Sequence, residues 1–208
     1  MALTFSSGEQ VALPEMTLSK RVLLPAQKSA LIVVDMQNDF VKPGGRLVVP
    51  SAEATLPALG ATIERARAAG LRIVYTQDTH LEGDKEWAIW PEHCRKGSWG
   101  WEIVDELAPR GDDLVVHKSR YDGFYDTSLD HYLSRVWGIE HLLILGTISS
   151  ICVLHTAASA GLRWFHVVTA VDGISALNDF DMALTVRQIS WLYTGEVVRS
   201  VEDVVFNA

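Results

Sequence analysis

The thiol of Cys152 lies at a predicted strand-to-helix turn, where the backbone could make it reactive. Cys152 follows the apolar run Leu142–Leu145 and the small, polar segment Gly146–Ser150. We interpret the run as a buried strand, the segment as a tight turn, and the alanine-rich residues from Cys152 onward as a helix. The dipole and free N–H groups of a helix N-terminus favour thiolate, which is the nucleophilic form of cysteine. The alternative is a buried structural cysteine, since free cysteines are often buried.

Two charged residues stand at the ends of other predicted strands. Asp35 ends the strand at Ala30–Val34, and Lys118 follows the strand at Leu114–His117. In parallel sheets, ligands bind at the carboxyl ends of the strands, near the point where the strand order switches. Either residue alone could be structural, because Asp35 could cap a turn and Lys118 could be a solvated surface lysine. Together with Cys152 at the same sheet edge, they favour a site for proton transfer and nucleophilic attack.

A second group of candidate ligands follows the strand predicted at Leu71–Tyr75. Asp78 and His80 come directly after it, and Glu86 and His93 follow soon after. Carboxylate and imidazole groups suit zinc, manganese or iron. The structural alternative is that the Asp-x-His turn caps the strand and that His93 is a satisfied buried histidine.

Strand and helix patterns alternate along the chain. Near-continuous apolar strands separated by helices indicate a parallel sheet that is covered on both faces. Right-handed crossovers then predict a doubly wound, Rossmann-like α/β fold with a mostly parallel six-stranded sheet in a single domain. We expect an N-terminal arm at residues 1–28 and the catalytic domain at residues 29–208. Beyond the strands above, the pattern predicts strands at Phe165–Ala170 and Glu196–Val198 and helices at 51–70, Thr127–Val136, 152–161 and Asp179–Leu192.

Composition narrows the functional classes. The 208-residue chain has a formal net charge of −8, which argues against binding to nucleic acid or to anionic membranes. It has no apolar run of about 18 residues, and Met1–Lys20 lacks the apolar core of a signal peptide. Its two cysteines make no disulfide framework. We therefore expect a cytoplasmic protein.

Five segments, in their order along the chain, resemble the isochorismatase-like cysteine hydrolases, and in particular the nicotinamidase-related branch. The resemblance covers about residues 29–200. The segments are Ala-Leu-Ile-Val-Val-Asp-Met-Gln-Asn-Asp-Phe from Ala30, Asp-Thr-His from Asp78, Trp-Pro-Glu-His-Cys from Trp90, Val-His-Lys-Ser-Arg-Tyr from Val116, and Gly-Thr-Ile-Ser-Ser-Ile-Cys-Val from Gly146.

This resemblance implies a triad of Asp35, Lys118 and Cys152. Asp35 would take the thiol proton and return it to the leaving amine, while Lys118 would keep Asp35 ionised and help stabilise the thiolate. Cys152 would attack an amide carbonyl, and water would hydrolyse the resulting thioester. The resemblance also implies an oxyanion hole formed by the N–H groups of Ile148 and Cys152, beside a cis peptide bond between Thr147 and Ile148.

The resemblance further implies a divalent metal held by Asp78, His80 and His93, which in nicotinamidases binds the pyridine nitrogen of the substrate. Glu86 falls where that branch has a variable further ligand, so it is the weakest assignment. No organic cofactor is implied.

Three aromatic residues match positions that contact substrate in relatives. Phe40 and Trp90 match the residues that sandwich the substrate ring, and Tyr121 lies in a segment that lines the pocket. The alternative is that these side chains simply fill the core, as most aromatic side chains do.

Cleavage of nicotinamide to nicotinate and ammonia is the leading expectation. The alternatives that keep the triad are N-carbamoyl, ureide or maleamate-type amides, or isochorismate, because Arg120-Tyr121 is similar to the isochorismatase branch. A Cys–His pair using His155 or His117 is a further alternative. A nucleotide-binding or redox module lacks its glycine-rich or Cys-x-x-Cys motif, and the complete triad disfavours an inactive scaffold. We expect a homo-oligomer acting on a small-molecule amide, with no nucleic-acid or membrane partner.

Overall fold

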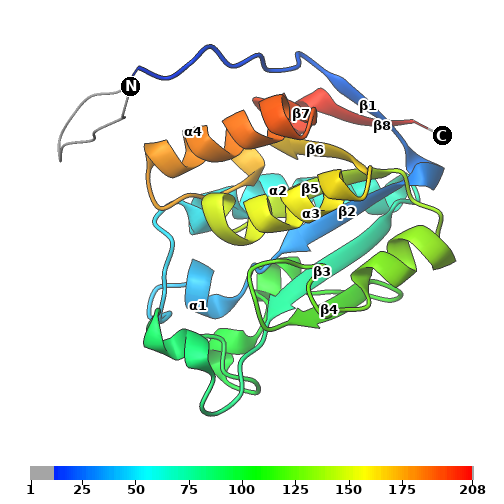
Figure 1. The fold of residues 1–208 in the computed structure, drawn as a ribbon. Coiled ribbons are helices and arrows are strands. Elements are labelled where there is room, and N and C mark those ends of the chain that lie inside the picture. Colours follow the sequence, from blue (N-terminus) through cyan, green and yellow to red (C-terminus); the bar gives the residue numbers. More distant parts are fainter. Residues whose placement is uncertain (1–11, 208) are drawn as a thin grey trace.

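The structure, a computed structural model, describes residues 12–207 and is built on a six-stranded parallel sheet (Figure 1). The spatial order of its strands is β4-β3-β2-β5-β6-β7. This arrangement confirms the predicted doubly wound α/β fold. The strands are β2 (Ser29–Val34), β3 (Arg72–Asp78), β4 (Leu114–Lys118), β5 (His141–Gly146), β6 (His166–Ala170) and β7 (Glu196–Val198).

Both faces of the sheet are covered, as the continuous apolar strands predict. All six residues of β2 are buried, and successive side chains enter opposite cores. Leu31 and Val33 pack in the core beneath α2 (Ala52–Ala68). Ile32 and Val34 pack in the core beneath α3 (Leu154–Leu162) and α4 (Asp179–Arg187).

Several helical segments differ in extent from their predictions. The helix predicted to begin at Cys152 starts earlier, with a wide helical turn, η6 (Ser149–Val153), that runs into α3. The helix predicted at Thr127–Val136 has its regular part at η5 (His131–Val136). A short helix, α1 (Asn38–Val41), was not predicted, since four residues are too few to show a helical period. The predicted helix at Asp179–Leu192 is α4 continued by η8 (Gln188–Leu192).

The N-terminal segment lies against the body where the structure describes it. The backbone N–H of Ser19 donates to Val197 in β7. A separate two-stranded parallel sheet then joins β1 (Val22–Pro25) to β8 (Val204–Asn207). Residues 1–11 of the predicted arm lie outside the described residues, and the arm boundary at residue 28 stays a prediction. In the described part of the chain, every helix is too short or too polar to cross a membrane.

The strand order reverses beside β2. The chain runs outward from β2 through β3 to β4, and then returns to place β5 on the other side of β2. The carboxyl ends of β2 and β5 therefore flank the switch point, where open α/β sheets bind ligands. Asp35 and the turn after Gly146 lie at this point.

Candidate active site

The sheet brings Asp35, Lys118 and Cys152 into contact. Asp35 follows the last residue of β2, Lys118 ends β4, and Cys152 lies in η6 after β5. The Lys118 Nζ atom is 2.7 Å from Asp35 Oδ2 and 3.6 Å from Cys152 Sγ. All three residues are buried. The three residues proposed as a triad thus meet in one cluster shielded from water.

One oxygen of the Asp35 carboxylate accepts a hydrogen bond, and the other is available to accept a proton. The Thr76 hydroxyl donates to Oδ1 at 2.7 Å. Oδ2 faces the Lys118 ammonium but accepts no well-directed hydrogen bond from the described residues. Burial raises the pKa of Asp35 in spite of the nearby Lys118 charge. A carboxylate with a raised pKa and a free lone pair is suited to accept a proton.

Lys118 lies between two carboxylates. Its Nζ atom is 3.1 Å from Asp78 Oδ1 as well as 2.7 Å from Asp35 Oδ2. Burial alone would lower the pKa of Lys118, but the charges of Asp35 and Asp78 outweigh it, and the pKa lies well above its usual value. Lys118 is therefore an ammonium group that links the Asp35 site to Asp78.

Burial opposes the thiolate that the helix N-terminus favours at Cys152. Burial raises the pKa of the Cys152 thiol well above its usual value, and the Asp35 and Asp78 carboxylates raise it further, although Lys118 opposes them. The helix N-terminus does not decide the protonation state, because charge is costly in a buried site. This environment favours the thiol form of Cys152, so a nucleophilic Cys152 would need a base to remove its proton.

The turn before Cys152 depends on close packing of the backbone. Gly146 has φ +122°, and a Cβ atom there would lie 2.3 Å from the carbonyl oxygen of Val34. The next peptide bond, Thr147–Ile148, is cis, as the resemblance implies. Among the described residues, no acceptor occupies the Ile148 N–H. That N–H is therefore free to bind an oxyanion beside Cys152.

The predicted metal ligands also come together. One donor atom from each of the four side chains lies within 4.8 Å of the others, and all four residues are buried. His80 Nε2 and His93 Nε2 lie 3.0 and 3.3 Å from Asp78 Oδ2, and His80 Nε2 lies 4.0 Å from Glu86 Oε1. Two imidazole nitrogens and two carboxylate oxygens converging on one point fit zinc, manganese or iron. The four residues are Asp78, His80, Glu86 and His93.

Charge in the donor group is distributed unevenly. Burial opposes ionisation of Asp78, but the Lys118 charge and hydrogen bonds with His80 and His93 outweigh it and lower the pKa of Asp78. Burial likewise disfavours the charged form of His80, but its hydrogen bond and charge interaction with Asp78 raise its pKa to about 9. Burial and the charge of Asp78 raise the pKa of Glu86. Metal ligation at His80 therefore competes with a proton.

The candidate substrate-binding aromatics lie around these groups. The Phe40 ring is buried, 5.7 Å from the His93 ring between centroids. The Trp90 indole Nε1 donates to the Tyr121 hydroxyl at 3.1 Å. Tyr121 also contacts the ring of His155, with a centroid distance of 5.6 Å. Phe40 thus approaches the donor group through His93, and Trp90 and Tyr121 form a hydrogen-bonded pair.

The two histidines of the alternative Cys–His pair are otherwise engaged. The exposed His155 places its Nδ1 atom 2.7 Å from the Ile151 carbonyl oxygen. His117 precedes Lys118 in β4, so its side chain points to the other face of the sheet. There its ring packs 5.4 Å from the ring of Trp101. Neither contact favours a role as base for Cys152.

Residue-by-residue reading of the sequence missed Gln37 and Thr76, which position the site. The Gln37 side chain accepts from the Asp78 N–H and donates to the Asp78 carbonyl, both at 2.8 Å. Thr76 holds Asp35, as described above. Alternation along β3 could have found Thr76, which lies two residues before Asp78 and so on the same face. The role of Gln37 depends on a loop conformation that the sequence pattern does not reveal.

A fourth carboxylate, Asp39, was also missed. It is buried, and its oxygens accept from the backbone N–H groups of Arg46 at 3.0 Å and Cys94 at 2.7 Å. Cys94 has φ +47° and directly follows His93. Asp39 therefore fixes the backbone that presents His93.

Comparisons with known proteins agree with this geometry. The family profile described as "Isochorismatase domain" matches residues 29–203. The chain is 38% identical to N-carbamoylsarcosine amidase from Thermoplasma acidophilum, over 84% of this chain and 97% of that one, with a TM-score of 0.76. It is 33% identical over 156 residues to ureidoacrylate amidohydrolase from Azorhizobium caulinodans, covering 62% of this chain and 68% of that protein.

A third relative is the pyrazinamidase of Pyrococcus horikoshii, whose structure was solved in complex with zinc. The identity is 29% over 83% of this chain and 99% of that one, and the TM-score is 0.77. The profile match spans most of the chain, and the two solved relatives align over 84% and 83% of it. The chain therefore belongs to the isochorismatase family and is an amidohydrolase, an enzyme that acts on non-peptide C–N bonds.

Proposed function

We propose that this enzyme hydrolyses a small primary carboxamide to a carboxylate and ammonia through a thioester on Cys152, with nicotinamide as the leading substrate. The observation that carries the proposal is the buried contact of the Lys118 ammonium with Asp35 at 2.7 Å and with Cys152 at 3.6 Å. In that cluster a base, a cation and a thiol share a site without bulk water. Such an arrangement suits covalent catalysis at an amide carbonyl.

Acylation begins with the neutral thiol. Asp35 takes the Cys152 proton as the sulfur forms a bond to the carbonyl carbon, and the carbonyl oxygen gains the negative charge. The N–H groups of Ile148 and Cys152 donate to that oxyanion. The tetrahedral intermediate then collapses, its C–N bond breaks, and Asp35 returns the proton to the departing nitrogen to give ammonia.

Deacylation uses the same groups in the reverse order. Asp35 takes a proton from water while the water oxygen bonds to the thioester carbon. The second tetrahedral intermediate expels the Cys152 sulfur, which recovers its proton from Asp35. Lys118 keeps a positive charge beside both anions throughout and so stabilises whichever of them is present.

Nicotinamide is favoured by the four-residue donor group next to the triad. A divalent metal bound by Asp78, His80, Glu86 and His93 would hold the pyridine nitrogen and so orient the carboxamide. Asp78 contacts Lys118 as well as both histidines, so the donor group and the triad have a fixed relative position. Phe40 packs beside this group, where an aromatic ring of a substrate would lie. Trp90 and Tyr121 would complete the pocket.

A second candidate is an N-carbamoyl or ureide compound, which carries the same terminal carboxamide on a nitrogen atom. The specific observation is the 38% identity with N-carbamoylsarcosine amidase and the 33% identity with ureidoacrylate amidohydrolase. The nicotinamidase from Bacillus subtilis is 25% identical over 83% of this chain. The acylation chemistry is unchanged, and only the groups that hold the rest of the substrate differ.

The test is ammonia release by protein purified without chelator, with nicotinamide, N-carbamoylsarcosine and ureidoacrylate as separate substrates. We expect Cys152→Ala to lower turnover by at least about 10⁴-fold, because the nucleophile is lost. The matched control is Cys94→Ala, which removes the other cysteine and should retain activity. Release that persists in Cys152→Ala would contradict the mechanism. Cys152-dependent release from a carbamoyl compound but not from nicotinamide would select the second candidate.

A further inference from the structure

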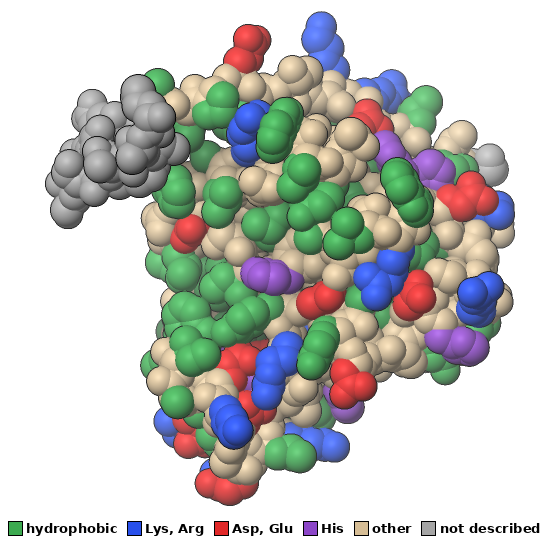
Figure 2. All heavy atoms as spheres, in the orientation of Figure 1, with side chains coloured by type: hydrophobic (Ala, Val, Ile, Leu, Met, Phe, Trp, Pro, Cys, Tyr) green, Lys and Arg blue, Asp and Glu red, His purple; other side chains and the backbone are tan. Residues whose placement is uncertain are grey.

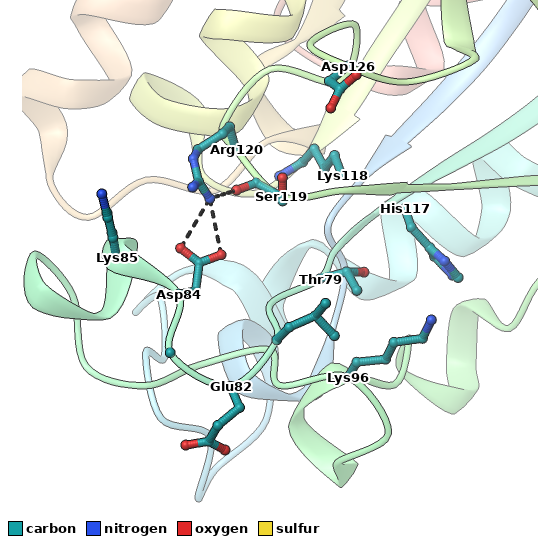
Figure 3. Close-up of a pocket in the computed structure, with 12 residues that line it drawn as sticks. Thr79, Glu82, Asp84, Lys85, Lys96, His117, Lys118, Ser119, Arg120 and Asp126 are labelled. Carbon is teal, nitrogen blue, oxygen red and sulfur yellow. Dashed lines mark hydrogen bonds and ion pairs between the residues drawn. The ribbon is translucent and has the colours of Figure 1, made fainter.

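Asp84 contacts two of the four candidate metal ligands at once, although it is not itself in the donor group. Its Oδ2 atom is 2.9 Å from His80 Nδ1, and its Oδ1 atom accepts from the Glu86 N–H at 2.9 Å. Arg120 Nη1 lies 3.2 and 3.1 Å from the two carboxylate oxygens, a contact that Figure 3 shows. The Asp84 side chain is 11% exposed.

The contact with His80 decides which ring nitrogen can face a metal. A neutral imidazole has one protonated and one free nitrogen, and a carboxylate accepting from Nδ1–H leaves Nε2 as the lone-pair donor. Nε2 is the His80 atom that points toward Asp78 and Glu86. His93 has an equivalent arrangement, with Nδ1 2.7 Å from the Pro91 carbonyl oxygen and Nε2 toward Asp78. Both rings therefore present the same nitrogen to the same point.

The contact with Glu86 shapes the turn that presents this ligand. Asp84 caps the short helix η2 (Lys85–Ala88) by accepting from the Glu86 N–H. The turn directs the Glu86 side chain inward, where it is 4% exposed, while neighbouring Lys85 stays exposed. Without the cap, the η2 turn loses the hydrogen bond that fixes its first residues.

Arg120 holds Asp84 from the other side. Asp84 and Arg120 come from separate loops after β3 and β4, and their side chains point toward each other across the pocket of Figure 3. Asp84 therefore receives hydrogen bonds from three directions: His80, the η2 backbone and Arg120. A carboxylate with its lone pairs fixed in this way has little freedom to rotate.

We propose that Asp84 is a positioning residue that sets the His80 tautomer and the η2 turn, so that a divalent metal meets a preformed set of donors, and that Arg120 keeps Asp84 in place. This inference rests on the metal site of the proposed function. It adds two residues to the proposed metal site. Asp84 contacts the ligands His80 and Glu86 in the loop after β3, and Arg120 contacts Asp84 from the loop after β4.

Binding of Co²⁺ alone tests the proposal, read as dissociation constant and as the visible absorption spectrum of the bound ion. We expect Asp84→Ala to weaken binding by roughly 10–100-fold and to alter the spectrum, because His80 and Glu86 lose their alignment. Asp84→Asn should fall between Asp84→Ala and the unmodified protein, since one amide oxygen can serve His80 or the Glu86 N–H but not both. Arg120→Gln should give a smaller loss.

Glu82→Gln is the matched control, because Glu82 is in the same loop, is exposed and pairs only with Arg95 among the described residues. It should bind Co²⁺ like the unmodified protein. An unchanged affinity and spectrum in Asp84→Ala would overturn the proposal, and if that variant does not fold, unchanged binding in both Asp84→Asn and Arg120→Gln would do so.

Measurements on the unmodified protein separate this inference from the proposed function. If it binds Co²⁺ and Asp84→Ala does not, but neither nicotinamide nor a carbamoyl compound is hydrolysed, the inference stands and the substrate assignment fails. If it binds no Co²⁺ while Cys152-dependent ammonia release is present, the inference fails and the cysteine mechanism stands.

Discussion

The pKa of the Cys152 thiol depends on burial and on opposing charges around it. Asp35 and burial favour the neutral thiol, while Lys118 favours the thiolate. A preformed thiolate would place three charges in one dry site, two of them negative, which burial penalises heavily. A neutral thiol beside a carboxylate of raised pKa avoids that cost, and in the proposed mechanism it would transfer its proton when the substrate binds.

The rate of Cys152 alkylation by iodoacetamide as a function of pH tests this balance. We expect the rate to rise with pH to beyond pH 9, because the thiol pKa lies above its usual value. Asp35→Asn should move the profile to lower pH, since it removes a carboxylate that raises the pKa, and should nearly abolish turnover. Lys118→Met should move the profile to higher pH. Shifts in the same direction for both variants would contradict the assignment.

Two controls are needed for that measurement. Cys152→Ala gives the background from Cys94, which is also buried with a raised pKa. Lys118→Met leaves Asp35 and Asp78 without their cation, a change that costs roughly 3–5 kcal/mol in buried pairs, so its folding must be verified by circular dichroism. The Asp35→Asn shift alone remains decisive if that variant unfolds.

Among the elements, the turn between β5 and η6 places Cys152. β5 pairs with β2 along its whole length, and Gly146 lies opposite Val34 in that register. The close approach at Gly146 lets the chain leave β5 tightly against β2 and bring Cys152 to the Asp35 side chain. Any side chain at this position would push the turn away from β2.

Gly146→Ala should therefore destabilise the protein and displace Cys152. We expect the free energy of unfolding to fall by at least about 3 kcal/mol, because the φ angle is unfavourable for alanine and the new Cβ atom would meet Val34. Gly138→Ala is the matched control, since Gly138 also has a positive φ, of +61°, but open space around its Cα. It should cost only about 1 kcal/mol. Equal losses in urea unfolding would show that the contact at Val34 does not matter.

At the scale of the whole molecule, the parallel sheet gathers charged residues at one edge and surrounds them with apolar layers. Figure 2 shows hydrophobic side chains gathered over α3 and α4, with charged and histidine side chains among them and around them. The buried residues Asp35, Asp78 and Lys118 lie at the sheet edge formed by the carboxyl ends of the strands. The expected homo-oligomer stays a prediction.

Metal binding at the donor group should increase the free energy of unfolding, and the increase should depend on pH. The pKa of His80 is about 9 without metal, against about 6.5 in an unfolded chain. Because the folded value is the higher one, His80 stabilises the metal-free protein fully below pH 6.5 and loses that effect as the pH rises through 9. Metal ligation requires the neutral ring, so metal affinity should increase with pH up to about 9.

Thermal unfolding with Zn²⁺ or with a chelator measures this coupling. At a metal concentration about 100-fold above the dissociation constant, we expect a gain of about 2.7 kcal/mol in the free energy of unfolding. The melting temperature should then rise by roughly 5–10 °C. At a fixed metal concentration the gain should be larger at pH 9 than at pH 7. His80→Gln should remove the pH dependence, and the control His131→Gln, at an exposed residue, should keep it. A gain that falls with rising pH would contradict the role of His80.

The amino-acid sequence alone predicts the fold class, the order of the main strands and helices, and the identity of the candidate triad and donor residues. Strands such as Ala30–Val34 are apolar throughout, and this composition predicts buried strands of a parallel sheet. Candidate site residues such as Asp35 and Lys118 lie at the carboxyl ends of those strands, and the carboxyl ends of strands in a parallel sheet share one edge. The short strands β1 and β8 carry too few residues to show a pattern.

Sequence patterns do not reveal the protonation of Cys152, the shared contacts of Asp78 or the positions of Gln37, Asp39 and Asp84, because all of these depend on the folded chain. A pKa depends on burial and on charges brought together from distant parts of the chain, such as Asp35, Lys118 and Asp78, and local sequence contains neither quantity. Loop residues that hydrogen-bond to ligands have no periodicity that identifies them. The residues able to do chemistry can therefore be read from the sequence, whereas their charge states and their supports depend on how the sheet assembles them.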